Sequence, residues 1–273
     1  MRVQTVGVVG LGKMGGPLAK HLASGGYEVI GYDVAATAIE SLGKFGVSSA
    51  KSCADVAERC NLVIVSVGFD SEVDEVVFGD TGLLAGATSK LVIAVASTIA
   101  PQAMKGIAAR SASEDVVFLD IPMTRGEQAA IDGNLLLLGG GEANSFDACR
   151  HAFETFAKDI YYLGDLGAGQ VGKMVNNLIL WSCISANVEG MALAKALSVD
   201  TEVLRDALLD SSAQNWAMEV RAEKWEMPWA EKDMSIVLKE ADEARISLPL
   251  CGSVKEVIKG IKIDLGQGMP KER

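Results

Sequence analysis

Short apolar runs alternate with amphipathic segments along the first part of the chain. Runs of this kind, bounded by turn-forming residues, predict buried strands. We expect strands at residues 3–9, 27–32, 62–67, 91–95, 116–121, 135–138 and 160–163, with helices between them such as 17–24 and 101–110. Regular alternation of strands and helices predicts a parallel sheet with right-handed crossovers, whose ligands bind at the carboxyl ends of the strands.

The pattern changes after Gly169, where only helical periodicity remains. The predicted helices cover residues 171–197, 201–209, 233–245 and 252–261. We therefore expect an α/β protein of two domains, a doubly wound parallel sheet at residues 1–164 and an all-α domain at 165–273, joined by a long interdomain helix. The apolar positions of that helix favour a buried spine that also pairs copies of the chain, as a homodimer or homotetramer.

A glycine-rich turn connects the first predicted strand to its helix. The turn has the form GxGxxG, which is a weak signal alone but a specific one between a strand and a helix, where it indicates a Rossmann-type dinucleotide site. Its glycines allow a tight turn and close approach of a pyrophosphate, which the free amides of the helix N-terminus then bind. The residues expected to contact the cofactor here are Gly10, Leu11, Gly12, Lys13, Met14 and Gly15.

Asp33 ends the second predicted strand, 23 positions after Gly10. An acid at this place hydrogen-bonds the adenosine ribose hydroxyls and repels a 2′-phosphate. Because no arginine follows at residues 34–36, we expect NAD to be preferred over NADP.

Two further loops leave carboxyl ends of predicted strands, at Val67-Gly68 and at Ser97-Thr98. They are expected to line the cofactor, with Ser97 or Thr98 near the nicotinamide. The same small residues would serve equally well as turn formers and helix N-caps.

A second glycine-rich stretch, residues 167–177, opens the long helix and places Lys173 and Asn177 four residues apart on one face. The helix start is the positive end of the macrodipole, and it favours the neutral amine that a general base needs. Apolar neighbours at Val171, Val175 and Leu178 would act in the same direction by excluding water. The spacing alone favours a solvated lysine beside an ordinary polar pair, Asn176-Asn177, over a catalytic pair.

Histidine is the usual group for moving a proton during hydride transfer. His21 lies inside the helix after the glycine turn, and His151 lies in a helical stretch at residues 146–156. Since neither leaves the carboxyl end of a strand, Lys173 is the better candidate.

The chain has 36 acidic and 25 basic residues, a net charge of −11, which disfavours a nucleic-acid or membrane-surface partner. Its five cysteines are scattered and never spaced as CxxC, so we expect reduced thiols, no metal site and a cytoplasmic location. No signal peptide or membrane span is evident.

Four motifs occur in an order that resembles the β-hydroxyacid dehydrogenase family, which includes 3-hydroxyisobutyrate dehydrogenase and tartronate semialdehyde reductase. They lie at residues 10–17, 120–126, 167–177 and 231–233 and span nearly the whole chain. The resemblance implies an oxidoreductase that transfers a hydride between NAD(H) and a small anionic 3-hydroxy acid or its semialdehyde.

The resemblance also implies roles for single residues. The lysine at Lys173 is the general acid/base, and Asn177 holds the substrate, with Asn176 beside it. The hydroxyl of Thr124 binds the carboxylate or the reacting oxygen. Lys232 and Asp233 close over the cofactor and the substrate.

The chain departs from the family at Thr124-Arg125-Gly126, where Ser-Gly-Gly is usual. Arg125 adds a cation with five donors to the substrate loop, where Thr124 and the Gly126 amide are also expected to bind the acid group. Our hypothesis is that Arg125 pairs with a carboxylate, sulfonate or phosphate of the substrate. The alternative is an arginine turned to solvent.

Two other functions stay open from the sequence. An imine reductase shares this architecture but usually has an aspartate or tyrosine at the position of Lys173. A non-catalytic dinucleotide-binding protein would be expected to have lost the pair of Lys173 and Asn177, which is intact.

Overall fold

The computed structural model describes residues 3–87, 90–111, 115–220 and 227–271. These residues form two compact units, one that ends at Lys173 and one that runs from Met174 to Lys271. The division falls inside a long helix, whose first turns belong to the first unit. The domain boundary predicted at Gly164 lies before this division and stays a prediction.

The first unit is built on one sheet, in the strand order β3-β2-β1-β4-β5-β6-β8-β7, with β9 paired to β8. The strands are β1 (Thr5–Val9), β2 (Glu28–Tyr32), β3 (Val47–Ser49), β4 (Leu62–Val65), β5 (Leu91–Val95), β6 (Val116–Asp120), β7 (Met123–Thr124), β8 (Leu135–Gly141) and β9 (Ala157–Gly164). Apolar residues fill β4 and β5 completely, as expected for strands covered on both faces.

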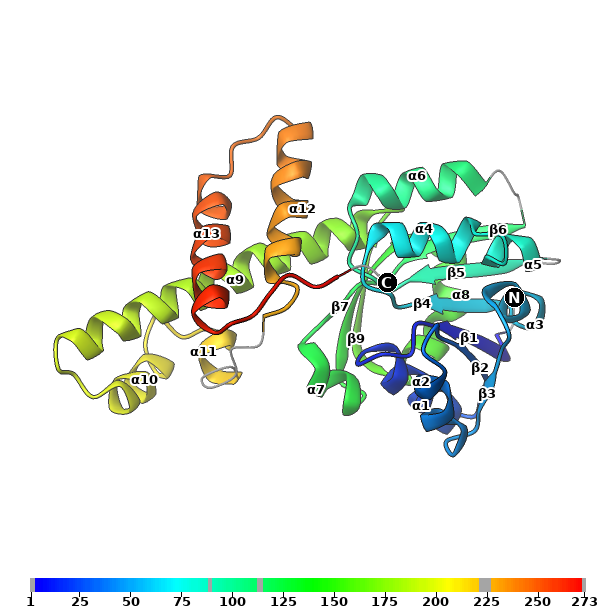
Figure 1. The fold of residues 1–273 in the computed structure, drawn as a ribbon, viewed down its shortest axis with the longest axis horizontal. Coiled ribbons are helices and arrows are strands. Elements are labelled where there is room, and N and C mark those ends of the chain that lie inside the picture. Colours follow the sequence, from blue (N-terminus) through cyan, green and yellow to red (C-terminus); the bar gives the residue numbers. More distant parts are fainter. Residues whose placement is uncertain (1–2, 88–89, 112–114, 221–226, 272–273) are drawn as a thin grey trace. The chain divides into compact units, whose positions relative to one another are not determined.

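Helices cover both faces of this sheet, which confirms the doubly wound fold (Figure 1). On one face α1 (Gly15–Ser24), α2 (Ala36–Gly43), α7 (Gly126–Ile131) and α8 (Ala143–Phe153) contribute to a core around Leu18 and Phe146. On the other, α3 (Cys53–Arg59), α4 (Asp70–Phe78), α5 (Leu83–Gly86) and α6 (Pro101–Ser111) pack around Val73 and Met104.

The parallel strands end in register. Val9 pairs with Tyr32 on one side and with Val65 on the other, and the row continues through Val95 to Asp120. The loops that follow these strands therefore begin at one edge of the sheet. Beyond β6 the sheet differs from the parallel arrangement expected, because β8 runs antiparallel to both β6 and β7. The two-residue strand β7 lies on this irregular side.

The second unit is helical, as the sequence predicted. Its helices are most of α9 (Ala168–Ala196), then α10 (Thr201–Leu209), α11 (Trp216–Val220), α12 (Ala230–Glu243) and α13 (Pro249–Asp264). Figure 1 shows α12 and α13 side by side, and their buried residues form one core with Trp181 and Ile184 of α9. Among the helices within the described ranges, none is long and apolar enough to cross a membrane.

Candidate active site

The glycine-rich turn lies between β1 and α1. Gly10 has φ of 85°, and a Cβ at this position would lie 2.3 Å from the Ser66 carbonyl oxygen, so only glycine fits. No atom lies within 4 Å of the place where a Cβ of Gly12 would be. Met14, the N-cap residue of α1, supplies no side-chain hydrogen bond to the helix. An open turn before an uncapped helix start fits the phosphates of a dinucleotide.

Asp33 follows β2 and is tied to the glycine-rich turn. Its Oδ2 accepts a hydrogen bond from the Leu11 amide at 2.7 Å, and its Oδ1 accepts one from the Ala35 amide at 2.8 Å. Each carboxylate oxygen has a second lone pair, so these bonds are compatible with binding a ribose hydroxyl. Sequence reasoning did not foresee that Asp33 also holds the turn.

The loops after β4 and β5 are bonded to each other. The Val67 amide donates to Ser97 Oγ at 2.9 Å, and the Gly68 amide donates to the Glu72 carboxylate at 2.7 Å. Ser97 is buried, with Thr98 half-buried beside it. Because α6 begins only at Pro101, the Ser97 hydroxyl links two loops instead of capping that helix.

The substrate loop predicted at residues 124–126 connects β7 to α7. Thr124 is buried, and its Oγ1 donates to the Leu136 carbonyl at 3.4 Å. Arg125 Nη1 lies 2.6 Å from Asp159 Oδ2 and donates to the Asn134 carbonyl at 3.1 Å. Arg125 therefore already has an anionic partner within its own unit, which the sequence did not reveal.

Arg125 and Gly126 have φ of 79° and 81°, in the left-handed region that favours glycine. The turn therefore suits glycine at both positions, and Arg125 occupies one of them with a strained backbone.

Lys173 lies in the part of α9 that belongs to the first unit, and it is half-buried. Its Nζ donates to the Met123 carbonyl oxygen at 2.6 Å, one residue before Thr124. The structure thus brings the candidate proton carrier to the strand that holds the substrate-loop hydroxyl. The apolar wall predicted around Lys173 is wrong for two of its members. Val171 is 45% exposed and Val175 is 51% exposed, because this face of α9 is not covered by the described residues.

Asn177 and Asp233 lie together in the second unit. Asn177 is buried, and its Nδ2 donates to Asp233 Oδ2 at 2.8 Å. Asn176 Nδ2 donates to Asn177 Oδ1 at 3.0 Å. Lys232 is half-buried, with its Nζ 5.5 Å from the centre of the Trp229 ring. The amide of Asn177 is therefore held in one orientation by two neighbours.

Among the buried polar residues to which sequence reasoning gave no role are Asp120, Gln170 and Lys262. Asp120 and Gln170 are fully buried at the start of α9. Lys262 is also buried, and its Nζ lies 2.8 Å from the Glu231 carboxylate next to Lys232. Asp120 and Gln170 stand inside the motifs at 120–126 and 167–177, which is a signal that could have identified them. Lys262 lies outside every motif.

Neither histidine contacts a predicted site residue in the bonds that the structure shows. His21 Nε2 lies 3.2 Å from the Ala130 carbonyl and 2.9 Å from that of Ile131, so it links α1 to α7. His151 is exposed beside Glu154.

The cysteines are free thiols, and several are buried. Burial raises the pKa of the Cys53 thiol to about 11 and the pKa of the Cys60 and Cys149 thiols to about 12. These three are therefore poor nucleophiles.

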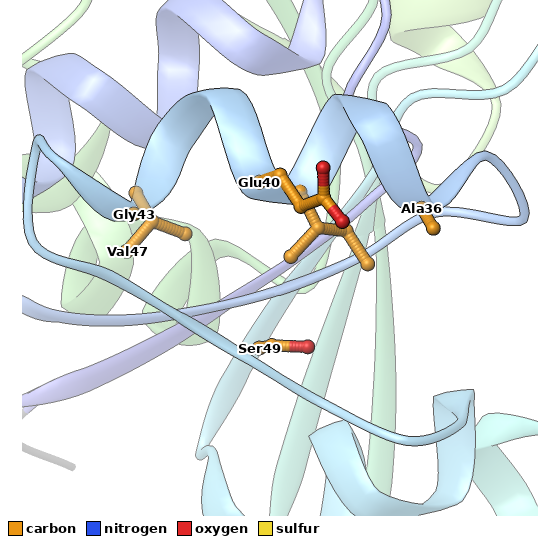
Figure 2. Close-up of a pocket in the computed structure, with 6 residues that line it drawn as sticks. Ala36, Glu40, Gly43, Val47 and Ser49 are labelled. Atoms are coloured by element: carbon orange, nitrogen blue, oxygen red, sulfur yellow. The ribbon is translucent and has the colours of Figure 1, made fainter.

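A hollow of about 300 Å³ is lined by residues of α2 and β3. Figure 2 draws these residues, which are Ala36, Ile39, Glu40, Gly43, Val47 and Ser49. None of these is a predicted site residue, and β3 is the strand at the edge of the sheet.

Two family profiles match the chain. The profile described as the NAD binding domain of 6-phosphogluconate dehydrogenase matches residues 5–164. The profile described as NAD-binding of NADP-dependent 3-hydroxyisobutyrate dehydrogenase matches residues 167–269. Together they indicate a nicotinamide dinucleotide as the cofactor.

Individual relatives agree with these matches. A 3-hydroxyisobutyrate dehydrogenase of Pseudomonas aeruginosa is 31% identical, over 90% of this chain and 88% of that protein. An NAD-dependent L-serine dehydrogenase of the same species is 33% identical, over 80% of this chain and 73% of that protein. A solved structure of Mycobacterium tuberculosis 3-hydroxyisobutyrate dehydrogenase with L-serine has a TM-score of 0.85 and 24% identity, and covers 97% of this chain and 95% of that one. At that identity it supports the fold alone.

Proposed function

Because the chain belongs to the β-hydroxyacid dehydrogenase family, we propose that it transfers a hydride between NAD and a small 3-hydroxy acid or the corresponding semialdehyde. Family membership makes it an oxidoreductase that uses a nicotinamide dinucleotide. One observation carries the finer proposal. Lys173, the residue that matches the family's acid/base, has its Nζ 2.6 Å from the Met123 carbonyl, beside Thr124.

In this proposal Lys173 moves the proton of the substrate oxygen. The bound nicotinamide supplies or accepts the hydride. During oxidation the neutral amine takes the hydroxyl proton, and during reduction the ammonium returns it. The bond to the Met123 carbonyl supports this role, because it holds Nζ at the residue that precedes Thr124 in the chain.

The remaining site residues bind and orient the substrate and cofactor. We propose that Asn177 binds the reacting oxygen of the substrate. Its side-chain amide is held in place by hydrogen bonds with Asp233 and Asn176. Lys232 and Asp233 are assigned to closure over the cofactor and substrate.

In the proposal, the acid group of the substrate is bound by Thr124, Arg125 and the Gly126 amide. Because a guanidinium has five N–H donors, the pairing of Arg125 with Asp159 is compatible with binding a substrate anion as well. The cationic side chains of Arg125, Lys173 and Lys232 would attract such an anion despite the net charge of −11.

We propose that the cofactor is bound by residues of the glycine-rich turn and of the loops after β2, β4 and β5. These residues are Gly10, Leu11, Gly12, Lys13, Met14, Gly15, Asp33, Val67, Gly68, Ser97 and Thr98. The carboxylate of Asp33 supports a preference for NAD, because it would repel a 2′-phosphate. In the variant Asp33→Asn we expect kcat/KM for NADP relative to NAD to rise at least about tenfold. Equal use of both coenzymes by the unaltered enzyme would overturn the preference for NAD.

The assembly belongs to the proposal as well. Apolar side chains on α9 are exposed in the single chain, among them Ile179 at 59% and Leu193 at 62%, and they suit a homodimer or homotetramer. We retain residues 1–164 and 165–273 as the two domains. The free thiols suit a reducing compartment such as the cytoplasm.

The test is a panel of 3-hydroxy acids and semialdehydes, sulfonated and phosphorylated ones included, followed by NADH absorbance. Lys173→Ala should lower kcat by about a hundredfold to ten-thousandfold while NADH binding is retained. The matched control is Lys195→Ala, an exposed lysine near the other end of the same helix, which should keep full turnover. Unaltered turnover by Lys173→Ala would remove this residue from the reaction. Absence of activity across the panel would reject the proposed substrate class.

A further inference from the structure

The start of α9 is held by a buried carboxylate. Asp120, the last residue of β6, is 0% exposed. Its Oδ1 accepts a hydrogen bond from the Gly167 amide at 2.7 Å, and its Oδ2 accepts one from the Gln170 amide at 2.8 Å. A negative charge at this end of a helix is also favoured by the macrodipole. Asp120 therefore joins the end of a sheet strand directly to the first turn of α9.

Two glycines make room for this carboxylate. A Cβ on Gly140 would lie 2.6 Å from Asp120 Oδ1, and one on Gly169 would lie 2.7 Å from Oδ2. Real Cβ contacts are not this short, so a side chain at either position would displace the carboxylate or the helix. The position of Asp120 against α9 is thus determined closely by packing as well as by hydrogen bonds.

Gln170 ties the same turn of α9 to the loop after β5. Its side chain is fully buried, and Oε1 accepts from the Ile99 amide at 3.2 Å while Nε2 donates to the Ser97 carbonyl at 2.8 Å. The loop it grips carries Ser97 and Thr98, which are assigned to the cofactor. One glutamine therefore sets the distance between that loop and the helix.

Lys173 lies one turn beyond Gln170. Its Nζ bonds to the Met123 carbonyl, so the segment from Asp120 to Met123 is tied to α9 at both of its ends. A shift of the first turn of α9 would move Nζ relative to the substrate loop and the cofactor loop together. Misplacement of a reacting group by about 1 Å is enough to lower a rate about a hundredfold.

We propose that Asp120 and Gln170 are positioning residues, which hold the Lys173 amine at a fixed distance from the loop at residues 97–99. They touch neither substrate nor cofactor, and they act on turnover through Lys173. This inference rests on the proposed function, because it needs Lys173 to be the proton carrier.

The experiment compares Asp120→Asn and Gln170→Met with a matched control in the full chain. Asparagine keeps the size of Asp120 but offers one acceptor oxygen in place of two, and methionine keeps the length of Gln170 but loses both of its loop bonds. The control is Glu142→Gln, because Glu142 caps α8 through the amides of Asn144 and Ser145 in the same unit, on a helix without a site residue.

Both positioning variants should lower kcat about tenfold to a hundredfold, a loss that exceeds any rise in the dissociation constant of NADH. Glu142→Gln should leave both unchanged. In a Lys173→Ala background, Asp120→Asn should cause no further loss, because its effect passes through the missing amine. If Asp120→Asn does not fold, Gln170→Met decides the question.

Two outcomes would overturn the inference. The first is a kcat within about twofold of the unaltered enzyme in the folded variants, and the second is an NADH dissociation constant that rises in proportion to the loss of kcat. These outcomes are distinct from failure of the proposed function, which would show as retained turnover in Lys173→Ala itself.

Discussion

The two units bury charge in different ways. In the first, the Asp120 carboxylate accepts hydrogen bonds from the main-chain amides of Gly167, just before α9, and Gln170, in its first turn. In the second, Lys262 is 1% exposed and faces an opposite charge, the Glu231 carboxylate at 2.8 Å. A substitution does not remove a main-chain amide, whereas an ion pair is lost when either of its two side chains is replaced. The difference teaches that the second unit is the more vulnerable to a single substitution.

Both buried charged side chains contact the start of a helix that carries proposed site residues. Asp120 holds the first turn of α9, which leads to Lys173. Lys262 holds Glu231 in the first turn of α12 and also donates to the Pro228 carbonyl at 3.3 Å, just before Lys232 and Asp233. In each unit, a buried polar contact therefore holds the start of a helix that carries proposed site residues.

The largest effect is expected when the charge pair of the second unit is broken. Lys262→Met leaves Glu231 buried without its counter-charge, which should lower the free energy of unfolding by about 3–5 kcal/mol. Denaturant unfolding followed by tryptophan fluorescence measures the loss. The matched control is Lys259→Met on the same helix, where the exposed pair with Glu256 should be worth about 0–1 kcal/mol.

Removal of both charges sharpens the test. Glu231→Leu combined with Lys262→Met should recover much of the loss, because no uncompensated charge is then buried. Equal losses in Lys262→Met and Lys259→Met would contradict the contrast between the two units.

A smaller effect is expected at the buried carboxylate of the first unit. Asp120→Asn leaves one of the two amides, of Gly167 or Gln170, without an acceptor oxygen, a loss of about 1–3 kcal/mol in the free energy of unfolding. The main chain otherwise stays intact, so the loss should be below that in Lys262→Met.

The pH dependence of this difference has a definite sign. Burial raises the pKa of Asp120 above its ordinary value of 3.8, although main-chain hydrogen bonds oppose the rise. The folded state then binds the proton more tightly than the unfolded state. The resulting stabilisation is complete below the unfolded pKa and is lost as pH rises through the folded pKa. Unfolding free energies from about pH 4 to about pH 7 should therefore show the advantage of the unaltered protein over Asp120→Asn decreasing. An advantage that grows with pH would contradict the shift.

Local patterns were sufficient for much of the first unit and for the helical character of the second. The alternation of apolar runs and the turn at Gly10 predicted the longer strands, the two helical layers and the edge where the loops meet, but not the short strands β3 and β7. Residue pairs distant in the chain were not predictable in this way. Lys262 has the local pattern of a solvated helix residue, because its partner Glu231 lies on another helix. The exposure of Val171 and Val175 could not be predicted either, since periodicity identifies an apolar face but not what covers it.

The smallest effect concerns Arg125, whose ion pair is neither buried nor fully exposed. The Arg125 and Asp159 side chains are 35% and 34% exposed, so the pair should be worth about 0–1 kcal/mol. Its backbone is left-handed, with φ of 79°. Arg125→Ala and Arg125→Gly both remove the ion pair, but only glycine relieves the backbone. Arg125→Gly should therefore be more stable than Arg125→Ala by about 1 kcal/mol, measured by denaturant unfolding.

Because both variants lack the guanidinium, they should raise KM for an anionic substrate to the same extent. A KM that differs between them would assign the effect to the turn and not to the charge.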